Sequence, residues 1–372
     1  MEVSGQAIVL TNGLFNTKSA KTAHGLIRAS KRFEIVAVVD KSFYGKFVSI
    51  DTNQKITITE KPSAIPIYKD VQSFLKFNRT LKGFGSKNSC VSPAYCVVGV
   101  ASAGGLLPEE MREDILLAMK NSMSIINGLH SMLNEDKELA SCAKTHNVKI
   151  HDVRKIKSRA ELRFWSGEIS KVKSTKIVVM GTDCGLGKRT TAKMVVESLE
   201  KLGNSADMVY TGQTGWMQGW DYGFIFDSTL NDFVSGELEG AIVACYKGKA
   251  PDFIIIEGQA ALRNPSGPCG GEFLISCQVD GVVLQHSPKR KYYDGWEHVG
   301  ATIPSIASEV ALIEAYGKRV LAVALSTSKM TEKEMQQYKK VISKEINIPV
   351  FLPLEEGVAE MAKILKKLRN DN

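Results

Sequence analysis

The stretch of sequence with the clearest chemical meaning is the glycine-rich segment 178–191, VVMGTDCGLGKRTT. An apolar run precedes it and a helical pattern follows it, which is the setting of a phosphate-binding loop. Glycines let backbone N–H groups converge on an anion, and the positive end of the following helix points at the same place. The segment therefore predicts a phosphate site. We assign to that site Gly181, Thr182, Asp183, Cys184, Gly185, Gly187, Lys188, Arg189, Thr190 and Thr191.

The loop departs from the common pattern at two places. Five residues separate Gly181 from Gly187, one more than usual, and Arg189 stands where ATP-binding loops have the hydroxyl that binds magnesium. Arginine cannot ligate a cation, but its guanidinium pairs with phosphate oxygens in a forked geometry. We therefore favour a ligand such as the pyrophosphate of coenzyme A, bound without a metal. The alternative is that Thr190 binds magnesium and the loop holds ATP.

Three candidate bases follow or flank the predicted strands. Glu257 ends the apolar run 253–257, His286 ends the run 280–286, and Asp232 lies in a helical turn. A carboxylate or a neutral imidazole in such a place can take a proton from a nucleophile. With ATP as the ligand, Glu257 would instead hold magnesium through water. A carboxylate that caps a helix and a histidine that only packs are the structural alternatives.

A second group of residues could bind a small substrate. The segment 210–223, YTGQTGWMQGWDYG, is apolar for a loop and offers the neutral hydrogen-bonding groups that small-molecule pockets use. Arginines further along the chain could clamp carboxylates. The candidate substrate-binding residues are Thr211, Gln213, Thr214, Gln259, Arg263 and Arg290.

Composition places the chain among ordinary globular proteins. Of its 372 residues, 44% are hydrophobic and 24% charged, and no apolar run reaches the roughly 18 residues that span a bilayer. The N-terminus lacks the basic region of a signal peptide. The net charge of +8 is scattered, without the stripe that nucleic acid requires. We expect a cytoplasmic homo-oligomer with a small-molecule substrate, without a membrane or nucleic-acid partner.

The cysteines argue against a bound metal. The chain has seven of them and no C-x-x-C pair, which predicts reduced thiols and no metal site. They are Cys90, Cys96, Cys142, Cys184, Cys245, Cys269 and Cys277.

Strand-like and helix-like segments alternate along the whole chain, which predicts an α/β fold with parallel sheets covered on both faces. Residues 1–155 form a predicted Rossmann-like N-terminal domain. Residues 156–173 are charged and polar, and we interpret them as a linker. Residues 174–372 repeat the alternation around the phosphate loop and predict a P-loop NTPase-like, doubly wound domain.

The N-terminal domain has one feature of dinucleotide-binding proteins and lacks another. Asp40 ends a predicted strand, where an acid often binds ribose, but the G-x-G-x-x-G fingerprint is absent. We therefore expect this domain to complete a ligand site with residues 128–130 and the HDVR segment at 151–154.

Several long motifs occur in a fixed order, and together they resemble a two-domain P-loop family that includes a bacterial D-glutamate N-acetyltransferase. The motifs include GVASAGGLLPEEMRE (99–113), NGLHSMLNED (127–136), GTDCGLGKRTTA (181–192), TGQTGWM (211–217), IIIEGQAAL (254–262) and QHSPKR (285–290). The loop spacing alone is also similar to that of dethiobiotin synthetase.

The family resemblance implies acetyl transfer from acetyl-CoA to the amine of a small acidic amino acid, D-glutamate being the expected acceptor. Glu257, Asp232 or His286 would then be the base, Lys188 and Arg189 would hold coenzyme A phosphates, and Arg263 and Arg290 would hold substrate carboxylates. The dethiobiotin synthetase likeness implies an ATP- and magnesium-dependent ligase or kinase instead. A nucleotide sensor without turnover is a third alternative.

Overall fold

The structure is a computed structural model of the chain that describes residues 3–51, 55–83, 92–101 and 103–371. Its contacts divide the chain into two compact units. The first comprises Met1–Ile156 and Gln213–Gly219, and the second comprises Lys157–Gly212 and Trp220–Asn372. Among the described residues, no helix is long and apolar enough to cross a membrane.

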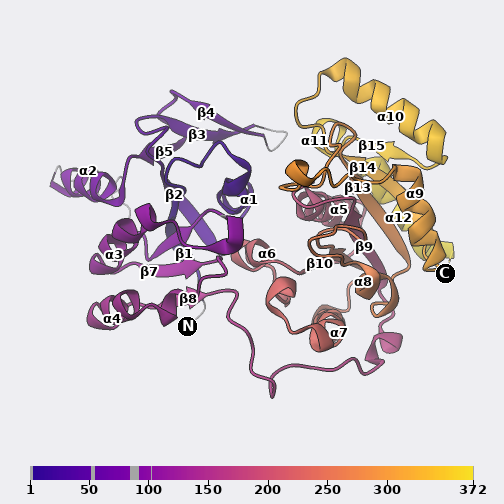
Figure 1. Cartoon of the computed structure of the whole chain (residues 1–372), viewed down its shortest axis with the longest axis horizontal. Coiled ribbons are helices and arrows are strands. Elements are labelled where there is room, and N and C mark those ends of the chain that lie inside the picture. The colour runs from indigo at the N-terminus through magenta and orange to yellow at the C-terminus, as the bar shows by residue number, and fades with distance from the viewer. Residues whose placement is uncertain (1–2, 52–54, 84–91, 102, 372) are drawn as a thin grey trace. The chain divides into compact units, whose positions relative to one another are not determined.

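The first unit is built on an eight-stranded sheet with the order β4-β3-β5-β2-β1-β6-β7-β8 (Figure 1). Its strands are β1 (Gly5–Leu10), β2 (Phe33–Val39), β3 (Phe47–Ile50), β4 (Ile56–Thr59), β5 (Ile65–Tyr68), β6 (Tyr95–Val98), β7 (Ser124–Asn127) and β8 (Ile150–Asp152). Its helices are α1 (Lys21–Arg28), α2 (Val71–Gly83), α3 (Arg112–Lys120), α4 (Lys137–Thr145) and α6 (Gln213–Gln218). All neighbouring strands are parallel except β3, which pairs antiparallel with β4 and β5.

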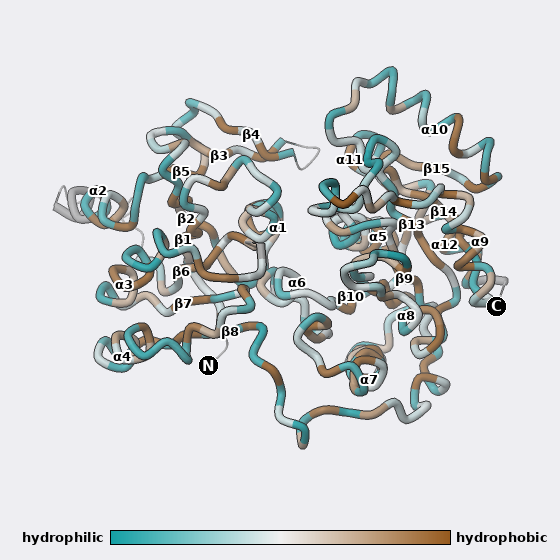
Figure 2. The backbone as a smooth tube through the Cα atoms, viewed as in Figure 1, coloured by the Kyte–Doolittle hydropathy of each residue, from teal (hydrophilic) through white to brown (hydrophobic). Residues whose placement is uncertain are grey.

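Alternate residues of β1 reach opposite faces of this sheet. Ile8 and Leu10 pack in a cluster with α2, α3 and α4, whereas Ala7 and Val9 pack with α1 and α6. Because every second side chain of a strand points to the same face, a strand covered on both faces must be apolar throughout. The continuous apolar runs in the sequence are explained in this way, and Figure 2 shows them as apolar strands beside mixed helices.

Asp40 has a structural task inside the first unit. Its buried carboxylate accepts hydrogen bonds from the Thr11 hydroxyl at 2.7 Å and from the backbone N–H groups of Gly13, Phe15 and Ser42 at 2.8, 3.0 and 3.0 Å. The side chain therefore fixes the loop after β1, and its oxygens are used for this rather than for a ribose.

The second unit has a seven-stranded sheet with the order β11-β10-β12-β9-β13-β14-β15, parallel throughout. Its strands are β9 (Thr175–Gly181), β10 (Ala206–Tyr210), β11 (Tyr222–Gly223), β12 (Phe253–Glu257), β13 (Gly281–His286), β14 (Val320–Leu325) and β15 (Val350–Phe351). Its helices are α5 (Lys188–Lys201), α7 (Asn231–Lys249), α8 (Gly271–Ile275), α9 (Ile306–Ala315), α10 (Glu332–Ile346), α11 (Pro353–Glu356) and α12 (Ala359–Asp371).

Helices cover both faces of the second sheet, so the predicted doubly wound fold is confirmed. Helices α5 and α12 pack together on one face, and α7, α8, α9 and α10 contribute to the core on the other. Strands β10, β11 and β12 lie on one side of β9, and β13, β14 and β15 lie on the other, so the order in which strands are added reverses at β9. In open parallel sheets, ligands bind at such a reversal, outside the carboxyl ends of the strands.

Helix α6 lies between β10 and β11 in the sequence but packs within the first unit. The hydroxyl groups of Thr214 and Thr22 lie 3.2 Å apart, in hydrogen-bonding contact. The Arg32 guanidinium donates to the carbonyl of Trp216 at 2.8 Å and lies 4.4 Å from the centre of its indole ring. The sequence predicted a loop here. The segment is instead a short helix that closes one face of the first unit's core.

The predicted linker, residues 156–173, is corrected by the structure: from Lys157 onward it belongs to the second unit. Glu239 on α7, a buried carboxylate, accepts hydrogen bonds from the N–H and hydroxyl of Ser166 at 2.6 and 2.9 Å and from the N–H of Ile169 at 3.0 Å. The segment is therefore held by hydrogen bonds of its backbone to buried acids of α7, which a strand or helix pattern in its own sequence does not reveal.

Glu237, two residues earlier on α7, holds the start of the same segment. It accepts from Lys157 at 2.5 Å and from the N–H of Arg163 at 3.0 Å. Gly236 allows this close approach, since a Cβ atom there would lie 2.0 Å from the carbonyl oxygen of Arg163.

We predict that Glu239→Ala lowers the unfolding free energy of the second unit by about 2–4 kcal/mol, because it leaves buried N–H donors without an acceptor. Thermal unfolding and limited proteolysis near Ser166 would measure the effect. Glu200→Ala, at an exposed site on α5, is the matched control. Equal melting temperatures for the two variants would contradict the role assigned to Glu239.

Candidate active site

The phosphate loop has the backbone that its sequence predicts. Strand β9 is buried along its whole length and ends at Gly181, and α5 begins at Lys188. Between them, Gly185 and Gly187 have positive φ angles of 64° and 104°. Residues with a side chain rarely adopt these angles, which turn backbone N–H groups toward the centre of such a loop.

Lys188 is buried and folds back over this loop. Its ammonium group donates to the carbonyl of Asp183 at 2.7 Å and to that of Ala260 at 3.0 Å. Burial lowers the pKa of Lys188, and the nearby Cys184 and Cys269 act in the opposite direction. The two carbonyls are neutral partners, so a phosphate that reaches the loop offers this buried cation a stronger one.

Arg189 pairs with Glu257 at the adjacent strand end. Strand β12 lies directly beside β9, and Nη1 of Arg189 is 3.6 Å from Oε1 of Glu257. Both side chains are largely removed from water, with exposures of 21% and 6%. The residue after the loop lysine therefore presents a fixed cation to the acid of the neighbouring strand. In ATP-binding loops these two positions hold magnesium.

Glu257 is also held by the residues that follow β10. The N–H of Thr211 donates to its carboxylate at 3.1 Å, and the Thr211 hydroxyl donates to its backbone carbonyl at 2.6 Å. Gln259 donates in turn to the Thr211 hydroxyl at 2.8 Å. Burial raises the pKa of Glu257, while Arg189 and the Thr211 N–H lower it. The net upward shift makes this carboxylate a stronger base than one in water.

His286, the second candidate base, supports the loop. Its Nδ1 lies 3.0 Å from the hydroxyl of Thr182, and the imidazole is buried. Burial lowers the pKa of His286 to about 4, so the ring is neutral at neutral pH and a weak base. The preceding Gln285 accepts from the Thr182 N–H at 3.0 Å and from the Thr191 hydroxyl at 2.7 Å. The end of β13 thus holds both ends of the loop.

The buried side chain of Asp183 holds the phosphate loop in place through hydrogen bonds to later segments of the chain. Its fully buried carboxylate accepts from Arg290 at 2.7 Å, from the N–H of Asp294 at 2.9 Å and from Asn264 at 3.3 Å. Arg290 also donates to the carbonyl of Cys184 at 2.6 Å. Asp183 and Arg290 were predicted to touch cofactor and substrate. The structure pairs them with each other, where they fix the shape of the loop.

The remaining predicted residues lie elsewhere. Arg263 is paired with Glu309 at 2.5 Å and with the Ser308 hydroxyl at 2.7 Å. Asp232 is exposed in the first turn of α7 and, among the described residues, has no hydrogen bond or ion pair with Glu257 or His286. Gln213 and Thr214 belong to α6 in the first unit.

Three contributors were not predicted: Gln285, Asn264 and Asp294. Gln285 is the residue before His286, and its place near the end of a buried strand was a usable signal. Asn264 and Asp294 lie in long loops after β12 and β13, and their partner is an acid whose burial only the fold creates.

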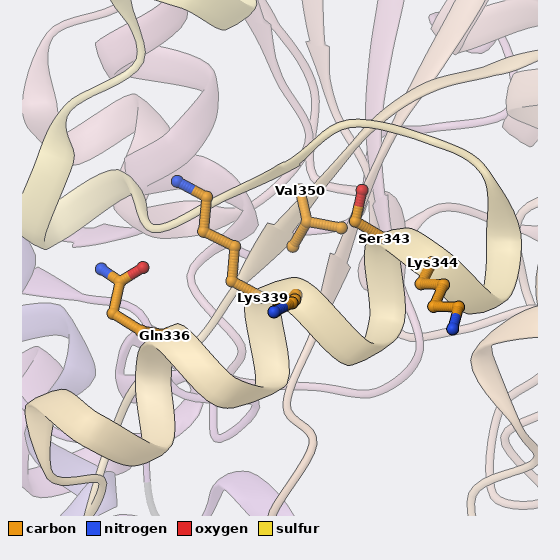
Figure 3. A pocket seen from close by; sticks show the side chains of 6 residues that line it. Gln336, Lys339, Ser343, Lys344 and Val350 are labelled. Atoms are coloured by element: carbon orange, nitrogen blue, oxygen red, sulfur yellow. The ribbon is translucent and has the colours of Figure 1, made fainter.

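Six of the seven cysteines are free thiols, and Cys90 lies outside the described residues. Among the described residues, no group of three or more His, Cys, Asp or Glu side chains is placed to hold a metal ion. A separate groove lies along α10 beside β15, and Figure 3 shows side chains that line it, Val350 among them. None of its residues belongs to the phosphate loop. They are Gln336, Lys339, Lys340, Ser343, Lys344 and Val350.

Comparison with known proteins matches two family models to the chain. Residues 163–362 match the domain of unknown function DUF1611_C, described as a P-loop domain, and residues 56–156 match DUF1611_N, described as a Rossmann-like domain. The chain belongs to the DUF1611 family. The family descriptions agree with the predicted Rossmann-like and P-loop domains.

Two curated relatives of this DUF1611 protein carry the name D-glutamate N-acetyltransferase. The protein from a Pseudoalteromonas species is 29% identical over 70% of this chain and 78% of its own length. The protein from Tritonibacter scottomollicae is 26% identical over 72% and 80%. A crystal structure of a DUF1611 family protein from Anabaena variabilis superposes with a TM-score of 0.82, at 24% identity over 97% of this chain and 99% of that one. This likeness supports the fold.

We predict that Asp183→Asn weakens binding of inorganic pyrophosphate about tenfold, because the loop loses a charge-assisted brace. Calorimetric titration measures the affinity, and the melting temperature is recorded alongside. Glu200→Gln, an exposed change on α5, serves as the control. If the variant binds pyrophosphate as the wild type does, the brace does not shape the site.

Proposed function

We propose that this DUF1611 protein is an N-acetyltransferase that moves an acetyl group from acetyl-CoA to the amine of a small acidic amino acid, D-glutamate first of all. The names of the two curated relatives support the reaction class. The observation that carries the proposal is the ion pair between Arg189 and Glu257 beside the phosphate loop.

The pair favours coenzyme A over Mg-ATP for a charge reason. Magnesium needs oxygen ligands, and ATP-using loops supply them from a hydroxyl and an acid. Here the guanidinium of Arg189 takes the place of that hydroxyl, and it forms an ion pair with Glu257 at 3.6 Å. A second cation at this place would be repelled by Arg189. A diphosphate can be held without a metal by Lys188, Arg189 and the loop N–H groups.

In this reaction, different side chains of the site have different roles. Lys188 and the loop amides hold the phosphates, and acetyl-CoA supplies the acetyl group. Glu257 takes the proton that the attacking amine must lose, because burial raises its pKa above the ordinary value. Thr211 and Gln259 orient this carboxylate through the hydrogen bonds described above.

Arg263 and Arg290 already have carboxylate partners within the chain. We therefore propose that they shape the site and do not bind the acceptor's carboxylates. An ATP- and magnesium-dependent ligase is the second candidate, since the loop keeps the dethiobiotin synthetase spacing and Thr190 offers a hydroxyl for magnesium one residue after Arg189. A cytoplasmic homo-oligomer stays our expectation for the assembled enzyme.

We predict that the wild type binds acetyl-CoA equally well with magnesium and with EDTA, and that it acetylates D-glutamate. Arg189→Thr removes the fixed cation, so acetyl-CoA should bind at least tenfold more weakly without magnesium and partly recover with it. Calorimetric titrations with acetyl-CoA and with ATP give the affinities. Arg189→Lys, which keeps a cation, is the control. Tight binding of ATP only with magnesium would replace this proposal with the ligase.

We predict that kcat/KM falls as the pH drops through the raised pKa of Glu257, because the base works only when deprotonated. The acid limb should lie above 4.5, the ordinary pKa of glutamate. His286 as the base would place it near 4 instead. Glu257→Gln should lower kcat by about 10²–10⁴, and Asp232→Asn should keep both the rate and the limb. An Asp232→Asn variant as slow as Glu257→Gln would overturn this assignment.

A further inference from the structure

The loop that follows β13 forms an arch, residues 290–303, whose two sides are joined by backbone hydrogen bonds. Tyr292 and Thr302 form an antiparallel bridge, and the N–H of Tyr293 donates to Ala301 at 3.0 Å. The N–H of Ile303 donates to Lys291 at 2.9 Å. These pairings close the arch at its base and leave residues 295–300 exposed at its tip.

The base of this arch is attached to the phosphate loop. Arg290 and the N–H of Asp294 both bond to the buried carboxylate of Asp183, at 2.7 and 2.9 Å. Trp296 lies two residues after Asp294, and two residues of extended chain span at most about 7 Å. The backbone of Trp296 therefore lies close to a residue that is hydrogen-bonded to the phosphate loop.

The arch exposes an aromatic side chain, Trp296, and a cationic side chain, Lys291. Trp296 is 36% exposed, and its ring stacks with that of His298 at 5.8 Å between centroids and 27° between planes. Lys291 is exposed, and its ammonium group lies 5.1 Å from the centre of the Tyr292 ring. Among the described residues it has no carboxylate partner, whereas the neighbouring Lys289 is paired with Glu334 at 2.6 Å.

We propose that this arch, residues 290–303, is the binding site for the 3′-phosphorylated adenosine end of coenzyme A. Trp296 stacks on the adenine, and Lys291 pairs with the 3′-phosphate. The inference rests on the proposed function for its ligand, since the diphosphate of the same molecule occupies the phosphate loop. It goes further by naming what separates coenzyme A from ADP at this site.

The chemistry of the ligand matches the two exposed groups. An adenine ring gains affinity from stacking on an aromatic side chain. A phosphate monoester is doubly charged, and a lysine without a carboxylate partner can pair with it at no cost in broken ion pairs. A single exposed tryptophan is common on protein surfaces. Here it is joined by a second ring and a free cation, beside a phosphate loop.

The test is calorimetric titration of the full chain with coenzyme A, 3′-dephospho-coenzyme A and ADP. The wild type should bind coenzyme A about tenfold more tightly than the dephospho form. Trp296→Ala should weaken both by about tenfold, because stacking does not depend on the 3′-phosphate. Lys291→Ala should weaken coenzyme A alone and abolish the difference. Lys344→Ala, a lysine of the α10 groove in Figure 3, is the control.

The outcomes separate this inference from the proposed function. Equal wild-type affinities for coenzyme A and its dephospho form, or unchanged binding by Trp296→Ala, would overturn the arch site while leaving acetyl transfer intact. Discrimination that Lys291→Ala removes would uphold the site even if no amine is acetylated. A wild type that binds ADP but no coenzyme A would overturn both.

Discussion

The ion pair between Arg189 and Glu257 is the interaction that links the phosphate loop to the acid of the neighbouring strand. It joins the first turn of α5 to the end of β12, at the place where the sheet order reverses. Burying two opposite charges costs solvation free energy, and their mutual attraction offsets this cost only where further hydrogen bonds satisfy both groups. Thr211 provides one of those bonds to Glu257. The loop can therefore bind anions with a charge it carries permanently.

The surrounding contacts keep this loop in one shape before a ligand arrives. Lys188 bonds to two carbonyls, Asp183 receives donors from two later loops, and His286 meets Thr182. Every charged group at the loop thus has a partner inside the chain. A ligand gains affinity by replacing neutral partners such as the carbonyls on Lys188, and it finds N–H donors already oriented. Preorganisation of this kind lowers the entropic cost of binding.

Local sequence was enough to predict the long buried strands and the phosphate loop, because continuous apolar runs and positive-φ glycines act over a few residues. The short strands β3, β4, β5 and β11, and the antiparallel pairing of β3, were not predicted. Contacts between distant segments were not predictable in this way. Helix α6 was interpreted as a pocket loop, since its apolar side chains and Thr214 pack against the first unit, where Thr214 contacts Thr22 of α1, a contact that local sequence does not show. The polar segment after Ile156 was interpreted as a linker because its acceptors, Glu237 and Glu239, lie about 70 to 80 residues later. Arg290 was given to a substrate because Asp183 gave no sign of being buried.

If the proposed function holds, the same ion pair couples acetyl-CoA binding to the base strength of Glu257. Burial and Arg189 act on the pKa of Glu257 in opposite directions, with burial the larger. Arginine stays charged across the physiological range, so only its position can change this balance. Under the proposed function, a diphosphate in the loop would attract the guanidinium away from Glu257. The carboxylate would then lose its strongest stabilising charge, so that its pKa would rise further and it would become a better acceptor for the amine proton. A metal ion held by the same acid would act in the opposite sense and weaken the base, so the proposed function gives a chemical reason for an arginine at this position.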